Sequence, residues 1–148
     1  IGALDGLTYL YLANNQICGH LPSEIGRLTS LKNLWLNCNR LEGPLPAELG
    51  ALTALTHLSL SKNRFTGKIP STLANLTNLE KLSLYSNNFD TGVPSDTIQG
   101  EELLNFLGPF RKLVRIEELE AENEKFKAEN EELRHFKAKY EELKAREM

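Results

Sequence analysis

Leucines alternate with polar residues along the first hundred residues in the order L-x-x-L-x-L. This alternation has the period of a half-buried β-strand, with the leucines pointing into a core. Each copy therefore predicts one short strand, and the copies recur every 24 residues. The three leucine columns are Leu7, Leu31, Leu55 and Leu79; Leu10, Leu34, Leu58 and Leu82; and Leu12, Leu36, Leu60 and Leu84.

Other residue types share the same period. An asparagine, whose amide can bond the backbone of neighbouring turns, follows each strand, and a glycine then allows a bend. A proline fixes φ on the return side, where a further apolar residue closes the core. The four columns are Asn15, Asn39, Asn63 and Asn87; Gly19, Gly43 and Gly67; Pro22, Pro46, Pro70 and Pro94; and Ile25, Leu49 and Leu73. A fixed period of this length predicts a solenoid whose strands stack into one parallel sheet.

These columns resemble the leucine-rich repeat family in its plant-type 24-residue subclass, LxxLxLxxNxLxGxIPxxLGxLxx. The resemblance implies an α/β solenoid, a right-handed superhelix whose concave strand face commonly binds another protein. Four repeats fill residues 1–98. Ile1, Gly2 and Leu4 align with the middle of a repeat, so we expect a solenoid truncated at its N-terminus, with further repeats and any targeting signal upstream.

Residues 99–110 predict a capping helix and linker. The segment EELLNFL has acidic residues in its first turn, and Leu103, Leu104 and Leu107 share one helix face. We expect this face to cover the last repeat.

Residues 111–148 consist mainly of strong helix formers, without proline or glycine. Their narrow apolar seam with charged flanks is typical of a coiled coil. With Ile116 at heptad position a, the a and d positions are Ile116, Leu119, Asn123, Phe126, Asn130, Leu133, Lys137 and Tyr140. After Leu133 the seam shifts by one residue, as in a stammer.

The flanking charges favour a parallel homodimer. In such a dimer each g residue faces the next e residue of the partner. The three pairs are all opposite in sign, namely Arg115 with Glu120, Glu122 with Lys127, and Glu129 with Arg134. The asparagines at a favour the same register. The predicted dimer contacts are Ile116, Leu119, Asn123, Phe126, Asn130 and Leu133. A solitary solvated helix and a different partner helix remain alternatives.

Composition excludes several classes of function. The net charge of −3 lies in the last 48 residues, and it provides no basic surface for nucleic acid. No stretch is long and apolar enough to span a membrane. Cys18 and Cys38 occupy different columns, so we expect reduced thiols. His20, His57 and His135 lack metal-ligand spacing, and we predict a protein without catalytic residues, cofactor or metal.

The outward positions of the strands form the candidate protein-binding face. Aromatic residues are frequent there, and such residues are enriched at interface hot spots, although lateral packing between strands would also place them there. The predicted binding residues are Tyr9, Tyr11, Asn33, Trp35, Asn37, His57, Ser59, Lys81, Ser83 and Tyr85.

These features predict a non-enzymatic interaction protein, a scaffold or signalling component that binds a protein ligand on its concave face and dimerises through the coiled coil. One alternative is a fragment of an extracellular receptor or secreted recognition protein. A glycan at the sequon Asn75-Leu76-Thr77 would favour this alternative. Another is the regulatory arm of a larger signalling enzyme. A Glu/Lys-rich coiled coil directly after the cap favours the cytoplasm over the extracellular space or cell surface.

Overall fold

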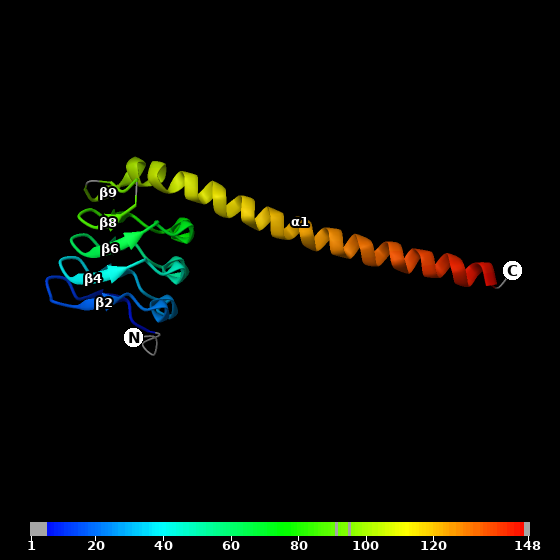
Figure 1. Ribbon diagram of the computed structural model, residues 1–148, viewed down its shortest axis with the longest axis horizontal. Helices are drawn as coiled ribbons and strands as arrows, with labels where there is room; N and C mark the ends of the chain where they lie inside the picture. Colours follow the sequence, from blue (N-terminus) through cyan, green and yellow to red (C-terminus); the bar gives the residue numbers. More distant parts are fainter. Residues whose placement is uncertain (1–5, 91, 95, 147–148) are drawn as a thin grey trace. The chain divides into compact units, whose positions relative to one another are not determined.

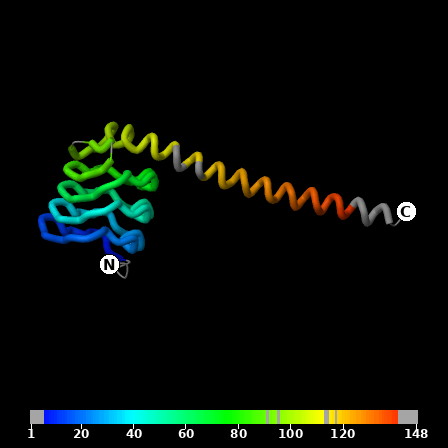
Figure 2. Tube along the Cα trace, in the orientation of Figure 1, coloured from blue at the N-terminus to red at the C-terminus, as the bar shows by residue number. Residues whose placement is uncertain are grey.

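The computed structural model describes residues 6–90, 92–94 and 96–146 of the chain. It divides into two compact units, Ile1–Lys112 and Leu113–Met148. Unit 1 is a solenoid in which successive repeats stack turn upon turn (Figure 1, Figure 2). Unit 2 consists of helix.

The first sheet of the solenoid has the strand order β1-β3-β5-β7-β9. Its first four strands are parallel and in register at the 24-residue spacing, so that Leu10, Leu34, Leu58 and Leu82 lie in one row. The solenoid and its parallel sheet are therefore confirmed. The fifth strand differs, because β9 pairs antiparallel with β7 and closes the edge of the sheet. The strands are β1 (Tyr9–Tyr11), β3 (Asn33–Trp35), β5 (His57–Ser59), β7 (Lys81–Ser83) and β9 (Ile98–Gln99).

A second parallel sheet, which the sequence did not predict, follows the strand exits. It has the order β2-β4-β6-β8 (Figure 1). Gly19, Gly43 and Gly67 lie in these strands at φ between 76° and 86°, a conformation that residues with a side chain rarely adopt. The bend that glycine permits is thus built into a second sheet. Its strands are β2 (Cys18–His20), β4 (Arg40–Gly43), β6 (Arg64–Gly67) and β8 (Asn88–Phe89).

Each return segment forms a short 3₁₀ helix directly after its proline. These helices are η1 (Ser23–Arg27), η2 (Ala47–Ala51) and η3 (Ser71–Asn75). They stack so closely that a Cβ on Gly50 would lie 2.3 Å from the carbonyl oxygen of Thr72, and one on Gly26 would lie 2.7 Å from that of Glu48. Only glycine fits where a further 3₁₀ helix packs on top.

The core is a column of leucines closed by the 3₁₀ helices, and an asparagine ladder borders it. Asn63 is buried, and its Nδ2 donates to the carbonyls of Leu36 (2.9 Å) and Leu60 (3.1 Å). Its Oδ1 accepts from the N–H of Leu41 at 3.0 Å. Asn39 and Asn87 repeat the arrangement. One side chain thereby joins two successive turns, as the asparagine column predicted.

Helix α1 (Gly100–Arg146) follows β9 and continues through Gly108 and Pro109. Within unit 1, Leu103 and Leu107 are buried and belong to the leucine core, so the first turns of α1 cover the last repeat. Leu104 does not take part, since it is 55% exposed. Its place in the core is taken by Phe106 and Phe110, which pack partly buried against the same cluster. The apolar face of the cap therefore follows the i, i+3, i+4 and i+7 positions from Leu103.

Candidate ligand-binding face

The outward side chains of β1, β3, β5 and β7 form two rows across the first sheet. Strand register places Tyr9, Asn33, His57 and Lys81 in one row, and Tyr11, Trp35, Ser59 and Ser83 in the next. The sequence alignment therefore predicted the correct neighbours within each row. Neighbouring strands lie about 4.8 Å apart, so adjacent members of a row are within reach of one another.

Aromatic side chains contact one another both within a row and between the two rows. The ring centroids of Tyr11 and Trp35 lie 5.6 Å apart, with the rings inclined by 33°. The Trp35 ring is nearly parallel to the ring of His57, at 13° and 6.5 Å between centroids. The Nδ1 of His57 lies 3.0 Å from the hydroxyl of the preceding residue, Thr56. The three ring-bearing residues come from both register rows, and we call the contacting set of Tyr11, Trp35 and His57 the aromatic row.

The contact between Trp35 and His57 was missed by sequence reasoning. The two residues belong to different columns, and column alignment compares only residues 24 positions apart. The signal that could have found it is side-chain size, since a large ring on one strand reaches the diagonal neighbour two positions away on the next.

Exposure varies along the face. Tyr9 and Tyr11 are 64% and 66% exposed, and Lys81 is also exposed. Ser83 is the exception, since only 5% of its surface is accessible, so its predicted exposure is wrong although it lies in the predicted row. It lies on β7, whose outer edge is occupied by β9. The remaining predicted residues are half-buried, namely Asn33, Trp35, Asn37, His57, Ser59 and Tyr85.

Asn37 lies two residues after Trp35, beyond the end of β3. Its Nδ2 lies 3.7 Å from the sulfur of Cys38, a weak contact. Its buried Oδ1 has no hydrogen-bond partner among the residues that the structure describes. An unpaired buried acceptor costs about 1–3 kcal/mol.

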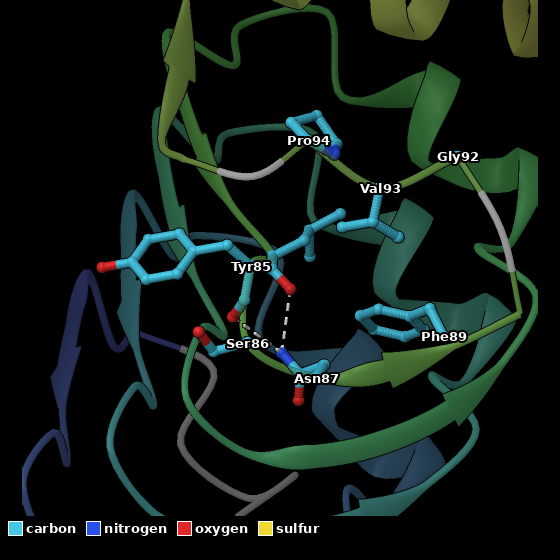
Figure 3. Close-up of a pocket in the computed structure, with 8 residues that line it drawn as sticks. Tyr85, Ser86, Asn87, Phe89, Gly92, Val93 and Pro94 are labelled. Atoms are coloured by element: carbon cyan, nitrogen blue, oxygen red, sulfur yellow. Dashed lines mark hydrogen bonds between the residues drawn. The ribbon is translucent and has the colours of Figure 1, made fainter.

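A cavity of about 440 Å³ lies at the last repeat, lined by residues between Leu84 and Pro94. Asn87 closes its floor through hydrogen bonds to the carbonyls of Leu84 (2.9 Å) and Tyr85 (3.4 Å), while Phe89 and Val93 form an apolar side (Figure 3). The aromatic ring of Tyr85 extends away from Phe89 (Figure 3).

In unit 2 the apolar seam of α1 is exposed along its length. Its accessible fractions range from 46% for Leu119 to 77% for Phe136, and Asn123 and Asn130 are exposed as well. Three charged pairs connect neighbouring turns among the described residues, namely Lys127 with Glu124 at 2.6 Å, Arg115 with Glu118 at 3.2 Å and Lys125 with Glu129 at 3.9 Å. The helix thus presents all six predicted dimer contacts to solvent in a single chain.

Other candidate chemistry is limited in the described part of the chain. Cys18 and Cys38 are free thiols. No group of three His, Cys, Asp or Glu residues in the described ranges is arranged to hold a metal ion. Among the helices that the structure describes, none is long and apolar enough to cross a membrane.

The repeat pattern, the stacked parallel strands and the asparagine ladder define a leucine-rich repeat solenoid. The chain belongs to the leucine-rich repeat family, whose model of a leucine-rich repeat region matches residues 1–139. No curated protein sequence matches the chain significantly.

Among solved structures, the chain is similar to the ectodomain of the membrane receptor kinase GASSHO1/SCHENGEN3 from Arabidopsis thaliana, in complex with CASPARIAN STRIP INTEGRITY FACTOR 2. The identity is 43% and the TM-score 0.59, over 60% of this chain and 11% of that chain. The ectodomain of the Arabidopsis receptor kinase HAESA, in complex with an IDA peptide hormone ligand, is 33% identical with a TM-score of 0.60, over 63% of this chain and 16% of that chain.

A plant ice-binding protein is also similar, at 39% identity and a TM-score of 0.57, over 60% of this chain and 29% of that chain. The chain thus spans between about a tenth and a third of the length of these proteins. Since one fold occurs in proteins with different roles, the function has to be argued from the face itself.

Proposed function

We propose that the chain is a non-enzymatic binding module that holds a protein or peptide ligand on its first sheet. The observation that carries this proposal is the aromatic row, in which three rings pack side by side on a sheet face that the rest of unit 1 leaves accessible. Packed aromatic side chains offer a large contact area that loses little conformational entropy on binding. Two of the similar ectodomains were solved with a peptide hormone ligand or with an integrity factor, which supports the same class of ligand.

The test is selection of binders from a displayed library of random 12-residue peptides. We expect the affinity of a selected peptide to fall at least about tenfold when Trp35→Ala removes the centre of the row, as for a hot-spot residue. Arg64→Ala is the control, because Arg64 is exposed on β6 of the second sheet. Trp35 is the only tryptophan in the sequence, so a change in its fluorescence on binding reports the location directly. Selected peptides that bind wild type and Trp35→Ala equally would contradict the proposal.

We also propose that α1 forms a parallel coiled-coil homodimer. In that register Glu122 faces Lys127 of the partner subunit, and Glu129 faces Arg134 of the partner subunit. A second copy therefore covers the exposed seam and brings opposite charges together along its flanks. The dimer would carry two solenoids and would bind a ligand with two sites more tightly than one solenoid does. After the first site is bound, the second solenoid meets the second site at a raised effective concentration.

Sedimentation of charge-reversed variants tests the register. Glu122→Lys with Glu129→Lys places like charges opposite each other, as does Lys127→Glu with Arg134→Glu, so each double variant alone should dissociate. An equal mixture of the two should restore a dimer of one copy of each. This rescue also shows that both variants still form helix. A wild-type chain that stays monomeric at tens of micromolar would overturn the dimer.

We propose further that the chain works outside the cell, as part of a receptor or a secreted recognition protein. The sequence favoured the cytoplasm, but the comparisons support the extracellular alternative, because the similar receptor chains are ectodomains. The sequon fits this location, since Asn75 is exposed at the end of η3. Mass spectrometry of the natural protein should find a glycan on Asn75. An unmodified Asn75 in protein recovered from the cytosol would contradict the proposal.

A further inference from the structure

The four parallel strands of the first sheet each contribute one side chain to a single line across the face. The line runs from Tyr11 on β1 through Trp35 and His57 to Lys81 on β7, whose backbone is in register with His57. One end is apolar and aromatic, and the other carries a lysine ammonium beside an imidazole. The face is therefore chemically different at its two ends.

The strand face carries more positive than negative charges. Its strands and their exits, residues 8–14, 32–38, 56–62 and 80–86, contain Lys32, Lys62 and Lys81 but only one acidic residue, Glu80. All four side chains are exposed. Among the described residues, the ion pairs lie within α1, so Lys81 has no carboxylate of the protein within 4.0 Å. An exposed lysine in this position is available to a carboxylate from a ligand.

The spacing of the two ends restricts the ligand. The aromatic end lies between β1 and β3, and the cationic end between β5 and β7, which is two strand spacings or roughly 10 Å away. An extended peptide in the polyproline II conformation rises ~3.1 Å per residue with three residues per turn, so it covers this distance in about three residues and keeps both side chains on the same side. The side chains that meet the two ends would thus stand about three positions apart in the ligand.

We infer that the face binds an extended acidic peptide across its strands, with an aromatic or aliphatic side chain on Tyr11 and Trp35 and a carboxylate at His57 and Lys81. This inference rests on the proposed function, which names only a protein or peptide ligand. The ligand needs no modification and no metal, because an aspartate or glutamate side chain supplies the negative charge.

The same random 12-residue peptide library tests the chemistry of the ligand. Peptides selected by the wild-type chain should contain Asp or Glu about three positions from an aromatic or aliphatic residue. Selection against Lys81→Glu should enrich Lys or Arg at that position instead. The matched control is Arg64→Glu, a charge reversal on the second sheet, which should select the wild-type pattern. A synthetic peptide from the wild-type selection should bind Lys81→Glu at least about tenfold more weakly, a difference that decreases at high salt.

The outcomes separate the two proposals. Two results would contradict the acidic ligand but not the proposed binding face. In the first, the selected peptides depend on Trp35 but contain no acidic residue. In the second, peptides selected against Lys81→Glu keep the same acidic residue. A library that yields no peptide dependent on Trp35 contradicts the proposed function and the inference together. Near-ultraviolet circular dichroism of Lys81→Glu that matches the wild-type spectrum shows that the variant is folded.

Discussion

The solenoid and the C-terminal helix use the same apolar residues in opposite ways. In the solenoid, Leu34, Leu58 and Leu82 are almost completely buried, because each turn covers the next. Along α1 in unit 2, Leu119 and Leu133 are exposed, because one helix has no other face to pack against. The repeat of 24 residues is satisfied within one chain, whereas the repeat of seven residues would be covered by the second helix of the proposed dimer. Periodicity therefore indicates where burial occurs as well as which element forms.

The two regions also differ in how polar side chains contribute. In the solenoid, the asparagines of the ladder bond the backbone of two turns, and Asn63 among them is buried. In the helix, charged side chains pair across one turn in full contact with water. The regions should accordingly respond to substitution on very different scales, which three predictions test from the largest effect to the smallest.

The largest effect is expected for Asn63→Leu. The change leaves the Leu41 N–H and the Leu36 carbonyl without their buried partner, and each unpaired group costs about 1–3 kcal/mol. We expect the free energy of unfolding to fall by about 2–5 kcal/mol, measured by urea denaturation with Trp35 fluorescence. Asn15→Leu is the control, because Asn15 is exposed and, among the described residues, its side chain bonds Leu12 and Ala13 in its own turn. Equal losses at the two positions would show that the ladder does not connect the turns.

An intermediate effect is expected for Gly50→Ala, which tests how tightly the turns stack. The added Cβ would overlap the Thr72 carbonyl, so η2 and η3 must separate, at a cost of about 1–3 kcal/mol. Gly108→Ala is the comparison in α1, where the new Cβ meets nothing within 4 Å apart from its chain neighbours. Because Pro109 follows, a Cβ at position 108 is disfavoured in helical backbone, which offsets the higher helix propensity of alanine. Gly108→Ala should therefore change the free energy of unfolding by less than Gly50→Ala does, and a stable Gly50→Ala would contradict the close stacking.

The sequence was a good guide wherever one period decided the structure. The leucine rows, the asparagine ladder and the neighbours within each row of the face all follow from residues 24 positions apart. The period gave no information about the closing strand β9, which is not a repeat and which accompanies the burial of Ser83. The second sheet was missed because a glycine in each of β2, β4 and β6 interrupts the alternation of apolar and polar residues that indicates a strand. The contact between Trp35 and His57 depends on side-chain reach, which alignment by column does not contain.

The smallest effect is expected on the surface of α1, and it sharpens the contrast between the two regions. Lys127 Nζ lies 2.6 Å from Glu124, but both side chains are more than 60% exposed, so water screens the pair. Lys127→Gln should therefore destabilise the helix by only about 0.2–0.5 kcal/mol at low salt, and by less at high salt. Thermal unfolding followed by circular dichroism at 222 nm measures this loss. Lys139→Gln is the control, because Lys139 is also exposed and lies beyond Leu133, where the seam shifts.

The same substitution also distinguishes a pair within the helix from one between helices. An intrahelical pair gives the same loss at every chain concentration. In the proposed dimer Lys127 also faces Glu122 of the partner subunit, so the loss should increase at concentrations where the dimer forms. A loss that stays constant while the chain dimerises would mean that the flanking charges do not set the register. A loss well above 1 kcal/mol in dilute monomer would contradict the screening of the helix surface, and with it the contrast to the buried ladder of the solenoid.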